Sequence, residues 1–111
     1  MSEERRGSPR YRVDLPARLI VGEKSLEAQL RDVCRDAALV EAAQALPLDT
    51  EVYIAVELHW TGGPLELPGR VIRVDPVAPS AHAMAILFRG VTPALAIQIE
   101  LLLDEYQRGK R

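Results

Sequence analysis

The amino-acid sequence predicts a mainly β protein, in which six antiparallel strands form a small barrel that a C-terminal α-helix closes. Three observations support this prediction. Hydrophobic and polar residues alternate over most of the chain with the period of two that is typical of half-buried strands. The connections between these segments are short enough for hairpins, and the period becomes helical only near the C-terminus. An antiparallel sheet of this kind buries its apolar face by rolling up into a barrel.

The composition favours one globular domain. The chain has 111 residues, of which 48% are hydrophobic and 27% are charged, and this length leaves no room for a second core of ordinary size. Residues 1–12 are polar and rich in arginine, and Gly7, Ser8 and Pro9 disfavour regular structure there. We therefore expect a flexible arm over residues 1–12 and a single domain over residues 13–111.

The first two strands are expected to form a hairpin. Alternation from Val13 to Val21 predicts the first strand. Pro16 indicates that this strand lies at an edge or at a break, because proline has no N–H to donate to a neighbouring strand. The residues from Gly22 to Ser25 favour a turn, and alternation from Leu26 to Leu30 predicts the second strand.

Four further strands are expected after this hairpin. The segment from Asp32 to Ala37 interrupts the alternation, so we expect it to be a connection, and Ala38 to Val40 then continue as the third strand. The clearest alternation, from Val52 to Leu58, predicts the fourth strand. The fifth is expected from Leu65 to Val74, with a bulge at Pro68 and Gly69, and the sixth from about His82 to Phe88.

The C-terminal segment carries the signals of a helix. Thr92 is a good N-cap and Pro93 suits the first helical position, so we expect a helix over about 93–108. The apolar residues that recur at helical spacing are Leu95, Ile99, Leu102 and Tyr106. The residues of the opposite side, which we expect to be solvated, are Glu100, Asp104 and Arg108.

The charge balance argues against nucleic-acid and membrane partners. Fourteen Lys and Arg residues against 16 Asp and Glu residues give a net charge of −2, and nucleic-acid binders typically carry a basic field. No apolar run approaches the roughly 18 residues that span a bilayer. Cys34 is the single cysteine, so no internal disulfide can form. We expect a cytoplasmic protein without membrane insertion.

The sequence shows no catalytic or metal-binding constellation, so we expect a non-enzymatic protein without a metal or cofactor. His59 and His82 lie apart without metal-ligand spacing, and lone histidines of this kind are most often structural. Asp32 and Asp36 do not suggest a carboxylate pair for acid–base catalysis, because an arginine beside each keeps it ionised and paired. Trp60 is either an exposed aromatic for partner contact or a half-buried packing residue, and both interpretations stay open.

The arginines of the arm are the remaining cluster with binding chemistry. Arg6 and Arg10 are separated by three residues directly before the first strand, and Arg5 and Arg12 lie beside them. Guanidinium groups hold phosphate oxygens bidentately and stack on purine faces, which lysine cannot do. A solvated basic tail is the alternative interpretation, because short arginine-rich termini are common.

Several features follow one another in a characteristic order along the chain. They are the Arg-x-x-x-Arg pattern of the arm, the strand with Leu15-Pro16-Ala17, the segment Asp32-Val33-Cys34-Arg35-Asp36-Ala37, and the strand with Ala85-Ile86-Leu87-Phe88 before the helix. This arrangement resembles the PilZ domain family over nearly the whole chain. In that family an RxxxR motif precedes a six-stranded barrel, a (D/N)xSxxG motif follows the second strand, and a helix closes the barrel. The family is best known as a bacterial receptor for cyclic di-GMP, a dinucleotide with two phosphates and two guanines.

The resemblance implies a binding site for cyclic di-GMP. Arg6 and Arg10 match the arm arginines that grip phosphate and guanine, and Arg5 is an expected helper. Asp32 matches the first position of the second motif, where a carboxylate or amide accepts from the guanine edge. The implied ligand-binding residues are Arg5, Arg6, Arg10, Asp32, Cys34 and Ala37.

Three of the positions depart from the family pattern. Cys34 stands where the family has serine, Ala37 where it has glycine, and Ala85 replaces a glycine that often opens the late strand. A thiol is a weak donor, so Cys34 costs ~1 kcal/mol if the serine hydroxyl contacts the ligand. Ala37 adds roughly 1–2 kcal/mol if its position needs a left-handed backbone. Together these make binding on the order of 30- to 150-fold weaker.

Three functions follow from these residues. In the first, the chain is a receptor whose arm is ordered by cyclic di-GMP, and a protein partner reads the changed surface. In the second, Cys34 and Ala37 mark a degenerate PilZ domain that no longer binds nucleotide and acts as a protein–protein interaction module. A nucleic-acid-binding barrel of the OB type explains the arginines but disagrees with the net charge of −2. The intact arm arginines and Asp32 favour the receptor.

Overall fold

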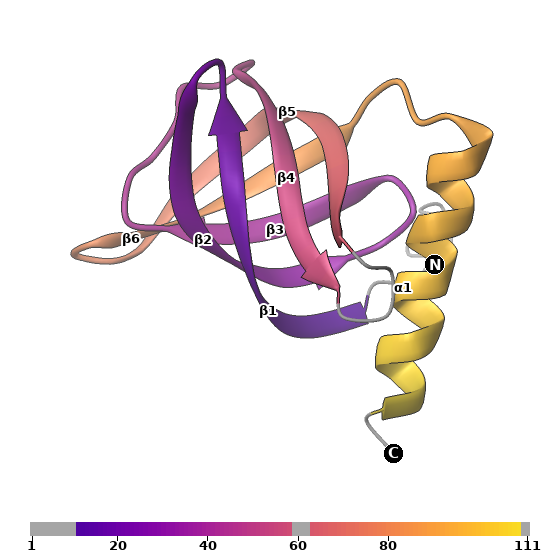
Figure 1. Cartoon of the computed structure of the whole chain (residues 1–111). Coiled ribbons are helices and arrows are strands. Elements are labelled where there is room, and N and C mark those ends of the chain that lie inside the picture. Colours follow the sequence, from indigo (N-terminus) through magenta and orange to yellow (C-terminus); the bar gives the residue numbers. More distant parts are fainter. Residues whose placement is uncertain (1–10, 59–62, 110–111) are drawn as a thin grey trace, which may run out of the picture.

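The structure is a computed structural model that describes residues 11–58 and 63–109, and it contains six strands followed by one helix (Figure 1). The elements are β1 (Tyr11–Val21), β2 (Lys24–Val33), β3 (Ala37–Ala42), β4 (Glu51–Leu58), β5 (Gly63–Ala78), β6 (Ala81–Phe88) and α1 (Pro93–Gly109). The mainly β fold with a C-terminal helix that the sequence predicts is confirmed. The expected site residues Arg5, Arg6 and Arg10, like His59 and Trp60, lie outside the described residues.

The strands form a closed antiparallel barrel in the order β1-β2-β3-β6-β5-β4, which β1 closes by pairing with β4. Pro16 nevertheless has a paired neighbour on one side only, Gln29 of β2, and the register between β1 and β2 shifts between Arg12 and Leu15, directly before the proline. The prediction of an edge or a break at Pro16 is confirmed. Pairing of β1 with β4 begins one residue after it, at Ala17. Pro16 thus occupies a point where its missing N–H interrupts little of the ladder.

The hairpin between β1 and β2 has a two-residue turn at Gly22 and Glu23, because Val21 pairs with Lys24. Gly22 has a φ of 61°, which is the positive value that a type II′ turn requires at its first central position. Glycine adopts this backbone without steric cost. The predicted turn is confirmed, although Lys24 and Ser25 already belong to β2.

The predicted connection from Asp32 to Ala37 is shorter than expected. Asp32 and Val33 belong to β2, Ala37 begins β3, and only residues 34–36 join the two strands. The physical reason is a β-bulge: the register of β2 against β3 shifts between Leu30 and Asp32. A bulge inserts an extra residue and changes which face the later side chains occupy. It therefore interrupts the alternation without ending the strand.

The prediction of a bulge at Pro68 and Gly69 is wrong. Both residues lie in regular register opposite Tyr53 and Val52 of β4. The irregularities of β5 against β6 lie further along, between Val71 and Arg73 and between Pro76 and Ala78. The strand consequently continues past the expected end at Val74.

Gly69 is required by a close approach between strands. A Cβ at this position would lie 2.6 Å from Cγ2 of Ile86 and 2.8 Å from the carbonyl oxygen of Leu87. Both distances are too short for real carbon contacts, and the carbonyl belongs to the backbone of β6. The glycine therefore lets β5 and β6 pack closely, which is a known use of glycine inside strands.

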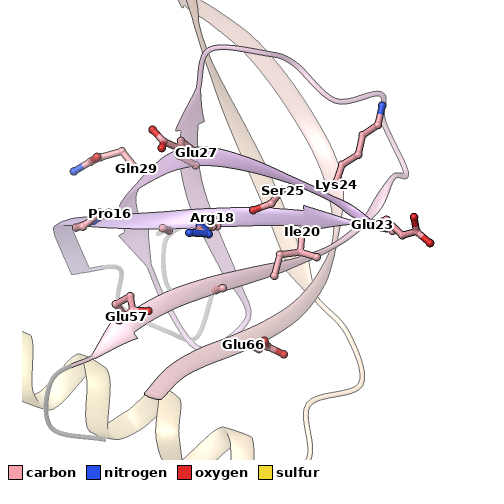
Figure 2. Close-up of a pocket in the computed structure, with 14 residues that line it drawn as sticks. Pro16, Arg18, Ile20, Glu23, Lys24, Ser25, Glu27, Gln29, Glu57 and Glu66 are labelled. Carbon is pink, nitrogen blue, oxygen red and sulfur yellow. The ribbon is translucent and has the colours of Figure 1, made fainter. Parts of the chain in front are cut away.

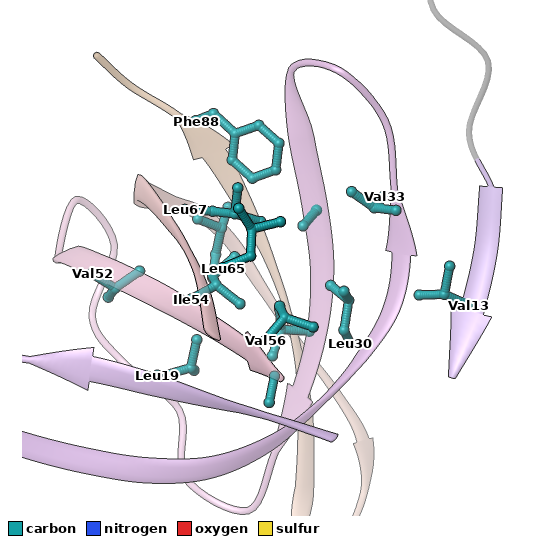
Figure 3. Packing of buried hydrophobic residues seen from close by; sticks show 14 of the residues in the cluster. Val13, Leu19, Leu30, Val33, Val52, Ile54, Val56, Leu65, Leu67 and Phe88 are labelled. Carbon is teal, nitrogen blue, oxygen red and sulfur yellow. The ribbon is translucent and has the colours of Figure 1, made fainter. Parts of the chain in front are cut away.

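The barrel interior is filled by apolar side chains from every strand (Figure 3). Leu19, Leu30, Ile54, Leu67 and Ile86 are completely buried. No polar or charged residue is buried among the residues that the structure describes. The inward residues of β6 are those that alternation assigns to one face, namely Met84, Ile86 and Phe88.

Helix α1 lies against one end of the barrel (Figure 1). The Leu95 N–H donates to Oγ1 of Thr92 at 3.1 Å, so the predicted N-cap is confirmed. Ile99, Leu102 and Leu103 are buried and join the barrel core. The helix thereby covers apolar side chains that would otherwise meet water at this end.

The opposite side of α1 is less polar than expected. Asp104 is exposed, but Ile97 and Leu101 are also 61% and 50% exposed. Glu100 forms an ion pair with Arg35 and is not simply solvated. The side chain of Arg108 lies outside the described residues.

Candidate ligand-binding site

Asp32 lies at the junction of the arm with the barrel. Its backbone pairs with Arg12 of β1 on one side and with Leu39 of β3 on the other. The Asp32 side chain is half-buried, and its Oδ1 atom is inaccessible to solvent. Residue 10 is joined to β1 only two positions before Arg12. The barrel therefore places the first residue of the second motif beside Arg12, which follows Arg10 by two positions in the sequence.

Two β-bulges lie next to the pairing of Arg12 with Asp32. One lies in β1 between Arg12 and Leu15, and the other lies in β2 between Leu30 and Asp32. Each bulge bends its strand and re-aims the side chains that follow. Asp32 owes its outward direction to the second bulge, because Leu30 faces the core and an unbroken strand would turn residue 32 inward as well.

Arg31 joins both bulges. Its Nη1 donates to Oδ1 of Asp14 at 2.7 Å, and its Nη2 and Nε donate to Oε1 of Glu41 at 3.1 and 3.3 Å. Gln29 also donates to Oδ1 of Asp14 at 3.0 Å. These bonds link β1, β2 and β3 next to Asp32, and sequence reasoning missed them. The break of alternation at residues 31–32 is the one local signal that could have revealed the bulge.

The loop after β2 is held by backbone hydrogen bonds. The Cys34 N–H donates to the Ala37 carbonyl at 2.9 Å, and the Phe88 N–H donates to the Asp36 carbonyl at 2.8 Å. Cys34 and Ala37 are both half-buried. Among the described residues other than glycine, only Asp49 has a positive φ. Ala37 therefore has no left-handed backbone here, and the penalty expected for replacing glycine does not arise from strain.

Arg35 connects this loop to the helix. Its Nε lies 2.6 Å from Oε2 of Glu100 on α1. The expectation that the neighbouring arginines pair with Asp32 and Asp36 is wrong, because Arg31 and Arg35 both bind other carboxylates. The loop is thus tied to α1 through an arginine that lies between Cys34 and Ala37.

A small apolar surface lies beside Asp32 on the outside of the barrel. Leu39 pairs with Asp32 and, on its other side, with Ala85 of β6. Residues that pair directly across antiparallel strands point to the same face. Leu39 and Ala85 are half-buried. The two side chains form an uncharged surface next to Asp32.

A hollow of about 590 Å³ occupies another part of the outer face (Figure 2). Among the residues that the structure describes, its lining includes Glu23, Glu27, Glu57 and Glu66 and two cationic side chains, Arg18 and Lys24. Of the expected site residues that the structure describes, Asp32, Cys34 and Ala37 do not line it. An excess of carboxylates repels an anionic ligand, so the described lining of this hollow does not favour a phosphate-bearing molecule.

The described residues include no group of three or more His, Cys, Asp or Glu side chains that could hold a metal ion. His82 lies on β6 opposite Ala42 and Pro76 and is half-buried. Within residues 11–58 and 63–109, no helix has the length and apolar character needed to cross a membrane.

Along the chain, the arm is followed by the first strand, the bulged second strand, the loop after it and, at the end, the closing helix. A family model described as the PilZ domain matches residues 4–105, which is nearly the whole chain. The chain belongs to the PilZ domain family. The resemblance predicted from the motifs is thereby confirmed.

Solved PilZ domain structures share the fold. The PilZ domain of YcgR from Escherichia coli, determined with c-di-GMP, has a TM-score of 0.79 and 15% identity over 96% of this chain and 95% of that one. The PilZ domain of CeSA from a cellulose-synthesizing bacterium has a TM-score of 0.68 and 20% identity over 90% of this chain and 99% of that one. At such identities the similarity shows the fold alone.

Other similar structures are longer than this PilZ domain chain. MotI, an inhibitor of motility from Bacillus subtilis, has a TM-score of 0.75 and 13% identity, and the match covers 96% of this chain and 53% of that one. The chain therefore spans about half the length of MotI. No curated protein matches the chain.

Proposed function

We propose that this PilZ domain is a non-enzymatic receptor for cyclic di-GMP. Arg6 and Arg10 grip the phosphates and guanine of the ligand, and Arg5 assists them. Asp32 accepts hydrogen bonds from a guanine edge, and Cys34 and Ala37 line the adjoining loop. A protein partner then reads the surface on which the arm has been ordered.

The proposal rests above all on the pairing of Arg12 with Asp32. Because of this pairing, the residue that follows Arg10 by two positions lies beside Asp32, the carboxylate residue of the second motif. Arginine supplies charge-assisted, bidentate bonds to phosphate, and these are the strong contacts to a dianion. Further support comes from the fold shared with the YcgR domain whose structure was determined with c-di-GMP.

The changed second motif weakens binding less than the sequence alone suggests. Ala37 has no positive φ, so only the exchange of serine for Cys34 remains as a direct loss. A lost hydroxyl hydrogen bond of ~1 kcal/mol corresponds to about fivefold weaker binding. A receptor with this one deficit still binds its ligand at concentrations near those of an intact site.

The decisive experiment is an isothermal titration of cyclic di-GMP into the purified chain, carried to millimolar ligand, with GTP as the specificity control. We expect saturable heat with cyclic di-GMP and none with GTP. Arg10→Ala should abolish the binding, whereas Arg18→Ala is a matched control, because Arg18 is an exposed arginine in the acidic hollow. Absence of heat with the unmodified chain would exclude the receptor and favour the interaction module that no longer binds nucleotide.

A further inference from the structure

The outer face of the barrel carries one continuous row of paired residues. Arg12 pairs with Asp32, Asp32 with Leu39, Leu39 with Ala85, and Ala85 with Arg73 of β5. Direct pairs across antiparallel strands share a face. The row therefore leads from the junction of the arm across β2, β3 and β6 to Arg73.

The direction of Arg73 depends on a bulge. Val71 of the same strand is completely buried, and residues two apart in a regular strand point to the same side. The register of β5 against β6 shifts between Val71 and Arg73, with Ile72 as the extra residue. This shift turns Arg73 outward, where its side chain is 72% exposed. A regular strand would have directed a guanidinium into the core.

The surface between the two ends of the row is apolar. Leu39 and Ala85 lie in the row itself, and Ala37 and Leu87 form the neighbouring pair on the same face. All four are half-buried. Neighbouring strands lie about 4.8 Å apart, so three steps separate Asp32 from Arg73 by about 14 Å. A ligand with two bases and two phosphates is large enough to contact both ends of such a surface.

Arg73 has a partner that it can exchange. Its Nε donates to Oδ2 of Asp75 at 2.8 Å, and both side chains are more than half exposed. An exposed pair of this kind contributes little to stability. A phosphate offers the guanidinium a bidentate, charge-assisted contact that competes well with one carboxylate oxygen.

We propose that Arg73 is a further ligand-binding residue, which contacts a phosphate of the cyclic dinucleotide from the end of the row opposite Asp32. The inference rests on the proposed function, because it extends the same site from Asp32 across Leu39 and Ala85. Asp75 opposes this phosphate contact, because its carboxylate binds the guanidinium of Arg73 when the ligand is absent. Arg73 lies at one end of the row, and Arg12 and Asp32 lie at the other.

The test compares cyclic di-GMP affinities of the full chain, measured by calorimetry, for the unmodified protein and for Arg73→Met, Asp75→Asn and Arg18→Met. We expect Arg73→Met to weaken binding about tenfold, because a hydrogen bond to a charged group is lost. Asp75→Asn should tighten binding about two- to fivefold by releasing Arg73 and removing a negative charge. Arg18→Met removes an equal charge outside the row and should change the affinity less than twofold.

The outcomes separate this inference from the proposed function. Saturable binding by the unmodified chain with equal affinity for Arg73→Met would overturn the role of Arg73 and leave the receptor intact. An equal loss in Arg18→Met would also overturn it, because the effect would then be one of net charge. Absence of binding by the unmodified chain would overturn both. Thermal unfolding of each variant verifies that the barrel is folded.

Discussion

Arg31 and Asp14 form an ion pair of 2.7 Å that joins the two β-bulges beside Asp32. The second carboxylate of this arginine, Glu41, extends the link to β3 at 3.1 Å. Bulges leave an unpaired residue in the ladder, and here the bonds of one side chain compensate for it. The ion pairs thereby stabilise the irregular part of the barrel from which the candidate site is built.

Replacement of Arg31 by methionine is therefore expected to destabilise the protein by about 1 kcal/mol, since two partly exposed ion pairs are lost. Urea unfolding measures this loss. The difference from the unmodified protein should shrink at high salt, because screening weakens such pairs. Arg18→Met is the control, since Arg18 forms no ion pair within the described part of the chain. Equal losses in both variants would contradict a specific role for Arg31.

The two substitutions in the second motif should behave differently when they are reverted. Cys34→Ser is expected to tighten cyclic di-GMP binding about fivefold, because a good donor replaces a weak one. Ala37→Gly should change the affinity less than twofold, because Ala37 already has an ordinary strand backbone. Calorimetric titration of both variants distinguishes them. A large gain from Ala37→Gly would mean that the bound state needs a backbone that alanine resists.

Gly69→Ala is expected to destabilise the barrel by about 1–3 kcal/mol, because the added methyl group overpacks the contact of β5 with β6. The crowding atoms are Cγ2 of Ile86 and the carbonyl oxygen of Leu87. Chemical denaturation gives the free energy of unfolding. Ser80→Ala, at an exposed position between the same two strands, should stay within about 0.5 kcal/mol of the unmodified protein. An unchanged stability of Gly69→Ala would show that the strands can separate at no cost.

The N-cap of α1 offers a test of the closing helix. Thr92→Ala should lower the free energy of unfolding by about 1 kcal/mol, because the Leu95 N–H loses its acceptor. Thr92→Ser keeps a hydroxyl in place and is expected to retain most of the stability. Thermal melts of the two variants decide the point. Similar losses in both would assign the effect to the methyl group of the threonine instead of its oxygen.

The elements themselves could be predicted because their signals are local. Alternation identified all six strands, and Thr92 with Pro93 identified the start of α1. The positions of the bulges could not be read in the same way, since a bulge is defined by the register of the partner strand. For this reason Asp32 was expected in a connection although it belongs to β2, and the irregularity of β5 was expected at Gly69 instead of after Val71.

The residues of the candidate site likewise fall into those that a local pattern predicts and those that only the strand order brings together. The motif residue Asp32 could be proposed from its place in the sequence. Its neighbours Leu39 and Ala85 depend on the strand order β2-β3-β6, which no local pattern reveals. The partners of Arg31 likewise come from two other strands. Which carboxylate an arginine selects is a property of the assembled barrel.

Closure of the barrel limits how another protein can associate with it. In the described part of the chain, each strand already has a neighbour on both sides. Most of the backbone N–H and C=O groups of the strands are therefore already paired, and the stretches with a neighbour on one side only are short: residues 11–16 of β1 lie outside its register with β4, and residues 24–27 of β2 lie outside its register with β3. An additional strand has little free edge to pair with, so a partner reads mainly side chains, either along the outer face that bears Asp32 or on the exposed Ile97 and Leu101 of α1.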